Sequence, residues 1–318
     1  MAPSAETAND QRSIVSRLVS EQDRFEARSR LRPPGLAIFC PGARSARILF
    51  EPPNGWSPLN PSVCLHLGEL WCVVRTVNYA LDGKRYVVRD PHGVICTENY
   101  LGRLDLRGRF LDPTLMRDLD PTSKPTPKKG YADVRLVSVC GKLAGSASVL
   151  EGENSRIARL SLDATGNVVR ADVQPSNQLH EKNWMPLSVN NEFKWIYSLD
   201  PVAVVPGPLR KCPFALEYSR GGAATRFGDG YLCVTHEVTD GGDSLIYWHR
   251  LVCLDARFNV TRVSPAWIFS RHGIEFCAGI AVDGDDLVLS YGIDDREAWI
   301  TRVSVHEICK IPWIDPVL

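Results

Sequence analysis

The feature that most constrains the fold is a short pattern that occurs five times along the chain. An apolar run meets a turn rich in Gly, Asn or Asp, and a second apolar run follows. This pattern is typical of β-hairpins. A weak all-β unit that repeats predicts a propeller, because each small sheet buries both of its faces only by stacking on its neighbours. The predicted hairpins join 61–67 to 70–75, 133–139 to 143–147, 185–189 to 193–197, 225–227 to 231–235, and 273–281 to 287–291.

Outer strands and loops complete this prediction. Strand pairs are expected at 157–162 with 168–173 and at 244–254 with 260–269, each after one of the five hairpins. The segment 111–130 contains several prolines, so we predict a loop at the rim of the central cleft rather than a strand. The fold class is therefore all-β, a five-bladed β-propeller, with a β-sandwich as the alternative that the same pattern allows.

The N-terminal part of the chain has a different character. Residues 1–10 are small and polar and are expected to be disordered, and the spacing of apolar residues in 11–31 predicts an amphipathic helix. Pro33 and Pro34 end that helix. Packing on the propeller and a contact between copies of the chain both fit the pattern. The expected organisation is 1–35 for this start and helix and 36–318 for the propeller.

Composition excludes several classes of protein. Lys plus Arg and Asp plus Glu each number 37, so no overall charge favours nucleic acid or an anionic membrane. No apolar run is long enough to span a bilayer, and the start lacks a signal-peptide core. The ten cysteines contain no C-x-x-C pair, which suits a reducing compartment, so we expect a cytoplasmic protein. Dinucleotide, Walker and G-x-S-x-G motifs are absent from the sequence.

The candidate site residues lie where predicted strands begin or end. Asp133 and Arg135 are two residues apart and share one face of a strand, as an acid with its orienting cation or as a plain salt bridge. Lys182, Asn183 and Trp184 precede an apolar strand. They supply a charge, an amide and an aromatic face, which suit a sugar or an anion, although a polar loop with a core Trp fits equally well.

A second group of candidates contains two histidines. His236 and Glu237 end one hairpin, and Tyr247, His249 and Arg250 follow in the next predicted strand. In facing strands these side chains could hold an anion. A metal site is the weaker interpretation, because no compact set of ligands accompanies the histidines. A structural role for each histidine also fits.

These segments resemble glycoside hydrolase family 130 over roughly residues 55–305. The resemblance rests on Asp133–Leu136, on Glu181–Pro186, on Tyr231–His236 with Tyr247 downstream, and on Phe276–Asp295. Members of that family are five-bladed propellers, and many are β-mannoside phosphorylases. Related mannosyltransferases share the fold. The Glu181–Pro186 and Ile274–Gly279 segments look closer to a branch of propellers found beside or fused to bacterial glycosyltransferases.

The resemblance also implies roles for single residues. Asp133 would be the catalytic acid, and Asp295 would follow the family's late Tyr-Gly motif. This sequence departs from the acid motif, with Ala132 and Val134 where the family has Glu and Pro, and Glu237 adds a negative charge beside a phosphate-site residue. The implied phosphate-binding residues are Lys182, His236 and Tyr247, and the implied substrate-binding residues are Asn60, Arg75, Arg135, Asn183 and Asp295.

The function implied is phosphorolysis of β-mannosides or similar glycosides with inversion, or the related glycosyl transfer. Phosphate is then the nucleophile, so one acid suffices and no carboxylate base is needed. An inverting hydrolase would need such a base, for which Glu237 or Asp294 would serve. A non-catalytic carbohydrate-binding propeller that partners a glycosyltransferase is the alternative from another class. No cofactor is expected, inorganic phosphate is the expected co-substrate, and a homo-oligomer fits.

Overall fold

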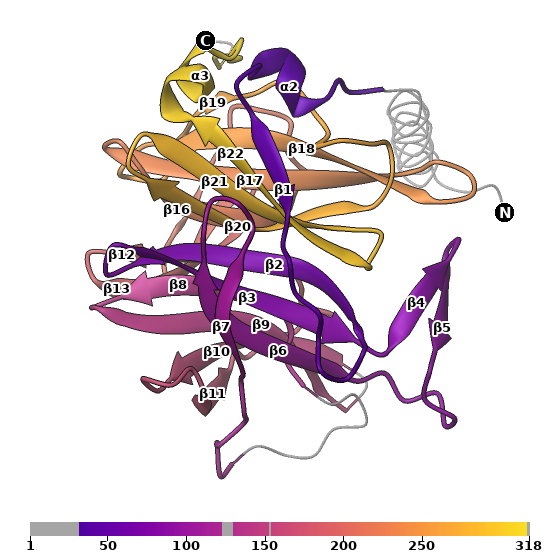
Figure 1. Ribbon diagram of the computed structural model, residues 1–318. Coiled ribbons are helices and arrows are strands. Elements are labelled where there is room, and N and C mark those ends of the chain that lie inside the picture. Colours follow the sequence, from indigo (N-terminus) through magenta and orange to yellow (C-terminus); the bar gives the residue numbers. More distant parts are fainter. Residues whose placement is uncertain (1–31, 123–129, 153, 317–318) are drawn as a thin grey trace, which may run out of the picture.

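The computed structural model describes residues 32–122, 130–152 and 154–316. Five four-stranded antiparallel sheets form the blades of a β-propeller (Figure 1). The all-β, five-bladed prediction is confirmed, and the β-sandwich is excluded. The predicted helix at 11–31 lies outside the described residues. Two short helices, α2 (Leu36–Phe39) and α3 (Val305–Lys310), flank the blades near the chain ends.

Each blade runs outward from an innermost strand, and the last blade takes its outer strand from the start of the chain. Blade 1 contains β2 (Ser57–His66), β3 (Glu69–Val77), β6 (Thr97–Leu104) and β7 (Phe110–Leu115); blade 2 contains β8 (Ala132–Val139), β9 (Lys142–Glu151), β10 (Asn154–Leu162) and β11 (Val168–Val173). Blade 3 contains β12 (Met185–Val189), β13 (Glu192–Leu199), β14 (Val202–Val205) and β15 (Leu209–Arg210); blade 4 contains β16 (Arg220–Phe227), β17 (Gly230–Asp240), β18 (Leu245–Leu254) and β19 (Val260–Val263). Blade 5 contains β20 (Glu275–Asp283), β21 (Asp286–Ile293), β22 (Glu297–Ser304) and β1 (Arg44–Arg47).

All five predicted hairpins are present, and each supplies the two innermost strands of one blade. Strands β2, β8, β12, β16 and β20 contact one another in a ring. The turns hold residues with positive φ, among them Gly68, Asn190 and Gly284, which explains why Gly and Asn mark these turns in the sequence. The expected outer pairs, 157–162 with 168–173 and 244–254 with 260–269, also form, as β10–β11 and β18–β19, but β19 ends at Val263 rather than at residue 269.

The prediction for 111–130 is wrong over its first part. Residues Phe110–Leu115 form β7, the outermost strand of blade 1. Pro113 is tolerated there because an edge strand has a partner on one side only, and the β6–β7 register shifts between Leu101 and Arg103.

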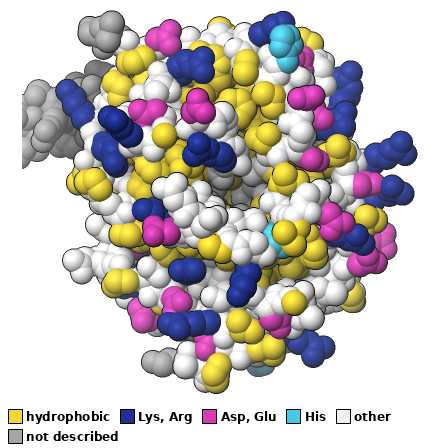
Figure 2. All heavy atoms as spheres, turned by 90° about the vertical axis from the view of Figure 1, so that its left-hand side faces the viewer, with side chains coloured by type: hydrophobic (Ala, Val, Ile, Leu, Met, Phe, Trp, Pro, Cys, Tyr) yellow, Lys and Arg dark blue, Asp and Glu magenta, His cyan; other side chains and the backbone are white. Residues whose placement is uncertain are grey.

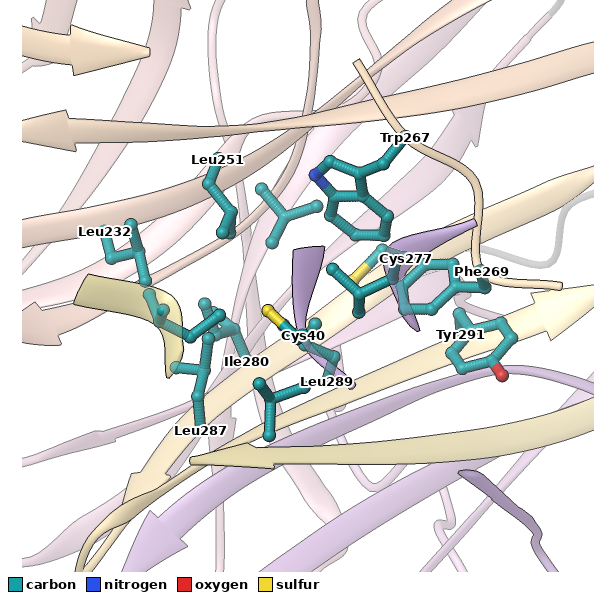
Figure 3. Close-up of a cluster of buried hydrophobic side chains, with 14 of the residues drawn as sticks. Cys40, Leu232, Leu251, Trp267, Phe269, Cys277, Ile280, Leu287, Leu289 and Tyr291 are labelled. Carbon is teal, nitrogen blue, oxygen red and sulfur yellow. The ribbon is translucent and has the colours of Figure 1, made fainter. Parts of the chain in front are cut away.

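Apolar side chains fill the space between neighbouring blades. Figure 3 shows the cluster between blades 4 and 5, where Leu232 and Leu251 meet Leu287 and Leu289. Each fully buried leucine contributes about 1.5–3 kcal/mol of hydrophobic free energy. Tyr291 also belongs to this cluster.

The Tyr291 ring stacks on Phe269 with centroids 3.7 Å apart, and the residue is 1% exposed. Its hydroxyl accepts a hydrogen bond from Thr301. Tyr291 is therefore a packing residue.

The ring is closed by β1, which pairs antiparallel with β22. All ten cysteines are free thiols, and most of them lie in or beside the strands. Among the described helices, none has the length and apolar character that crossing a membrane requires.

Candidate functional site

The site lies at the end of the propeller axis where the inner strands begin and the second strands finish. Two inner strands carry a bulge there: the β2–β3 register shifts between Leu59 and Ser62, and the β8–β9 register shifts between Ala132 and Arg135. Asn60 and Asp133 occupy these bulges with φ of 43° and 50°. Asn and Asp tolerate this left-handed conformation better than other side chains. Bulges of this kind re-aim side chains, and here they bring Asn60 and Asp133 together.

Asp133 is held by two residues of blade 1. Asn60 Nδ2 donates a hydrogen bond to Asp133 Oδ1 over 2.9 Å, and an Arg75 guanidinium nitrogen donates to the same oxygen over 2.7 Å. Arg75 is fixed in turn, because its Nε donates to Thr97 Oγ1 over 2.8 Å. The Arg75 side chain is 11% exposed and that of Asp133 is 30% exposed. Three predicted site residues therefore form one contact.

The surroundings of Asp133 favour its ionised form. Burial opposes ionisation, but the charge of Arg75, the Asn60 hydrogen bond and the charge of Arg135 together hold the pKa of Asp133 below its usual value. In the ligand-free protein Asp133 is therefore a carboxylate at neutral pH.

Asp295 is the second carboxyl group of the site and behaves in the opposite way. It follows β21 with φ of 49° and accepts a hydrogen bond from the Tyr79 hydroxyl over 3.2 Å. Burial raises its pKa; Arg75 counteracts this, and the charge of Asp133 adds to it. The neighbouring Asp294 is more exposed and pairs with Arg271 over 2.9 Å. Two carboxyl groups with pKa values pushed apart are a recurring arrangement in acid–base sites.

Arg135 does not form the predicted salt bridge with Asp133. It is 4% exposed and donates to the Trp184 carbonyl over 2.9 Å and to Asn183 Oδ1 over 3.0 Å. Its guanidinium also lies 5.5 Å from the centre of the Phe276 ring. Burial lowers the pKa of Arg135 to about 10, and Asp133 partly offsets this. The guanidinium stays charged at neutral pH and links the inner strands of blades 2 and 3.

His236 and Tyr247 lie beside this cation in blade 4. The two rings stack with centroids 5.4 Å apart, and Phe276 packs edge-on against His236 at 5.1 Å. His236 is 3% exposed. Burial, followed by the charges of His249, Arg135 and Arg220, lowers its pKa well below the usual value, so its imidazole is neutral.

Three buried polar atoms of this cluster have no hydrogen-bond partner among the described residues. They are Asn60 Oδ1, Arg135 Nε and His236 Nδ1. Buried polar atoms are normally paired, so a group of unpaired ones marks a place where a polar ligand would complete the set.

The segment before β12 is only partly placed as expected. Asn183, with φ of 65°, contacts Arg135, but Lys182 is exposed and the structure shows it no ion-pair partner among the described residues. Trp184 is 5% exposed, and its indole Nε1 donates to Glu181 Oε2 over 2.9 Å. Its ring packs edge-on against Trp195, so of the two alternatives that the sequence left open, Trp184 is a core residue and not an open aromatic face.

Other predicted polar residues have structural roles. Glu237 lies 3.7 Å from the Arg250 guanidinium and accepts a hydrogen bond from Ser219, so its charge is matched inside blade 4. His249 is fully buried against Trp267 and Phe269, with ring centroids 5.0 and 4.9 Å away.

The sequence analysis missed four residues of the cluster: Tyr79, Tyr86, Thr97 and Arg220. Asp82-Gly83, between the Tyr79 and Tyr86 runs, is a strong hairpin signal that went unused.

A separate hollow of about 440 Å³ lies at the opposite end of the molecule, between blades 2 and 3. The β8–β9 and β12–β13 turns and the neighbouring parts of β10 and β13 line it, with the basic side chains Lys142, Arg159 and Lys194. These turns are at the left of Figure 1, so they belong to the face shown in Figure 2, where acidic and basic side chains are interspersed. This hollow contains none of the predicted site residues.

No family model and no curated protein sequence matches the chain. Solved structures share its fold. A β-1,2-mannobiose phosphorylase from Listeria innocua, in complex with β-1,2-mannobiose, is 14% identical, with a TM-score of 0.54 over 84% of this chain and 92% of that one. A mannose phosphorylase from Leishmania mexicana, in complex with a phosphate ion, is 12% identical, with a TM-score of 0.55 over 96% and 98%.

A GDP-Man-dependent mannosyltransferase from Leishmania mexicana is also similar. It is 12% identical, with a TM-score of 0.55 over 86% of this chain and 93% of that one. At these identities the likeness concerns the fold. It confirms the propeller that the family resemblance implied and shows that this chain shares its architecture with mannoside phosphorylases and a mannosyltransferase.

Proposed function

We propose that the protein is a carbohydrate-active enzyme that cleaves β-mannosides or similar glycosides by inverting phosphorolysis, or transfers such a sugar. One observation carries the proposal. Residues far apart in the sequence bring a carboxylate, a second carboxyl group and unpaired buried polar atoms together at one end of the axis. The shared fold with mannoside phosphorylases supports it.

In this proposal Asp133 delivers the proton. Phosphate oxygen attacks the anomeric carbon from the face opposite the leaving group, the glycosidic C–O bond breaks, and the departing oxygen takes the Asp133 proton. The products are an inverted sugar 1-phosphate and a shortened glycoside. Arg75 and Asn60 position Asp133, while Asp295 and the Arg135–Asn183 pair bind sugar hydroxyls.

The low pKa of Asp133 in the free protein is compatible with this role. A dianion bound nearby raises the pKa of a carboxyl group, so phosphate binding promotes protonation of Asp133. His236, neutral and with an unpaired ring nitrogen, and Tyr247 supply hydrogen bonds to the anion, and Arg135 and Arg220 supply charge. Lys182 is exposed and would have to turn inward to join them.

The test is an incubation of manno-oligosaccharides with phosphate, followed by an assay for mannose 1-phosphate. Loss of a general acid costs typically 10²–10⁴-fold in rate, so Asp133→Asn should lower turnover by about that factor. Asp294→Asn, a neighbouring and more exposed carboxylate, is the matched control and should leave turnover within a few-fold. Free mannose released without phosphate would instead indicate an inverting hydrolase.

One observation favours a second candidate, a non-catalytic carbohydrate-binding propeller. In the free protein the charge of Asp133 is already paired with Arg75, and Asn60 donates a hydrogen bond to the same carboxylate, as in a structural ion pair. Binding of manno-oligosaccharides without turnover, in both the wild type and Asp133→Asn, would support this candidate and contradict the enzyme.

A further inference from the structure

An extra hairpin is inserted in blade 1 between β3 and β6. It is formed by β4 (Tyr79–Asp82) and β5 (Arg85–Val88), which stand apart from the blades at the right of Figure 1, on the side where β3 ends. Asn78 clamps its base: Asn78 Nδ2 donates to the Val94 carbonyl over 2.9 Å, and Asn78 Oδ1 accepts from the Cys96 N–H over 2.8 Å. The hairpin is therefore a fixed part of the fold.

The hairpin reaches across the site end of the propeller and contacts blades 4 and 5. Lys84 at its tip forms an ion pair with Asp240 of blade 4 over 2.7 Å. Arg296 of blade 5 donates a hydrogen bond to the Leu81 carbonyl. These contacts, with the Tyr79–Asp295 hydrogen bond, place the hairpin beside the carboxyl groups of the site.

One face of the hairpin carries two tyrosines. Tyr79 pairs with Val88 and Leu81 pairs with Tyr86, so Tyr79 and Tyr86 share a face and Val87 lies on the other. The two tyrosine rings meet edge to face with centroids 4.7 Å apart. They differ in exposure, because Tyr79 is 5% exposed and Tyr86 is 52% exposed.

Tyr86 nevertheless lies close to the chemistry. Its pKa is raised first by burial and then by the negative charge of Asp295, while the charge of Arg75 opposes the shift. The Tyr79 contact covers part of the ring and leaves the rest open. The open part of the Tyr86 ring therefore lies on the same side of the hairpin as Tyr79, whose hydroxyl bonds to Asp295.

We propose that Tyr86 forms the aromatic wall of a second sugar subsite beside Asp295, which holds the leaving-group or acceptor sugar. This inference rests on the proposed function. Sugar rings present apolar C–H faces that pack on an aromatic ring, while their hydroxyls bond to nearby carboxyl groups. The ring of Tyr86 and the carboxyl of Asp295 provide this combination, and the Lys84–Asp240 bridge keeps the wall in place.

The experiment compares Tyr86→Ala, Tyr86→Phe and Val87→Ala. In phosphorolysis of β-mannobiose, Tyr86→Ala should raise the KM for the disaccharide about five- to tenfold and leave the KM for phosphate and kcat within about twofold. Tyr86→Phe keeps the ring and should stay within about twofold in all three. Val87→Ala, on the opposite face of the same strand, is the matched control and should resemble the wild type.

The outcomes separate this inference from the proposed function. If the wild type turns over the disaccharide and Tyr86→Ala has an unchanged KM for it, the subsite is overturned while the proposed enzymatic function still holds. If the wild type does not turn over, binding of β-mannobiose is measured by calorimetry. Weaker binding by Tyr86→Ala than by Val87→Ala then supports the subsite without catalysis, and equal or absent binding overturns it. Matching thermal unfolding of the variants excludes a folding defect as the cause.

Discussion

Replacing Arg75 with Met tests how the site holds its central carboxylate. Arg75 is 11% exposed, and Asp133 lies 2.7 Å from its guanidinium. The substitution removes the charge that lowers the pKa of Asp133 and keeps a side chain of similar length. Asp133 would then be a largely desolvated carboxylate with Asn60 as its remaining neutral partner.

The size of the effect follows from this burial. Removing one partner of a buried ion pair costs about 3–5 kcal/mol. The 30% exposure of Asp133 and its remaining Asn60 bond reduce this, so we expect about 2–3 kcal/mol at pH 7.5. At roughly 2 cal/mol/K of unfolding entropy per residue, this lowers the Tm by about 3–5 °C.

The cost should depend on pH. In the wild type the folded-state pKa of Asp133 is lowered, so its stabilisation is present above the unfolded pKa and is lost as the pH falls through the folded pKa. In Arg75→Met, burial is opposed only by the Asn60 hydrogen bond and the charge of Arg135, so the folded-state pKa of Asp133 rises relative to the wild type. The carboxyl of the variant then protonates at a higher pH, and the variant regains stability relative to the wild type as the pH falls. The stability difference should therefore shrink by at least about 1 kcal/mol between pH 7.5 and 4.5.

The assay is urea unfolding at both pH values. The double variant Arg75→Met/Asp133→Asn provides the control, because a neutral amide needs no cation, and it should be more stable than Arg75→Met at pH 7.5. A difference between wild type and Arg75→Met that is the same at both pH values, or a double variant no better than the single one, would refute the reasoning.

Three further predictions follow from single contacts. Burial lowers the pKa of His249 to about 3, so below about pH 6.5 the unfolded chain takes up a proton that the folded chain excludes. Between pH 7.5 and 4.5 the wild type should therefore lose about 3 kcal/mol of stability in urea titrations, and His249→Phe should retain that stability. Substitution of the exposed His92 is the control and should not change this pH dependence. A Cβ on Gly292 would overlap Asn60, including its backbone nitrogen, so Gly292→Ala should displace Asn60 and lower turnover at least tenfold, and unchanged kinetics would contradict this packing. Because Lys182 is exposed, Lys182→Ala should change the KM for phosphate less than threefold in the coupled phosphorolysis assay, and a larger change would show that it moves into the site.

The blades could be predicted because their signals are local. In each hairpin the turn residues and the flanking apolar runs lie within about twenty positions, so the strands β2–β3 and β20–β21 can be read from the sequence alone. Strand β7 could not, since Pro113 argues against a strand unless one knows that the strand lies at an edge.

The partners within the site were harder to predict. Arg135 is two residues from Asp133 and was the natural candidate, yet the bulge and the positive φ of Asp133 turn that carboxylate toward Arg75, far away in the sequence. The sequence left open whether Trp184 is exposed or in the core, and its hydrogen bond to Glu181 holds it in the core. Such outcomes depend on the packing of blades against one another, which no local pattern encodes.

The β1–β22 pairing also bears on how the chain is made. Strand β1 is among the first parts of the propeller to leave the ribosome, but its partner is not synthesised until residue 304. During translation β1 therefore stays unpaired until blades 1 to 4 and the rest of blade 5 have been synthesised. Its backbone N–H and C=O groups can meanwhile pair with strands of other chains. Pairings this distant in sequence form slowly, so we expect the last step of folding to be the docking of this strand, which makes it the point at which the nascent protein is most exposed to aggregation.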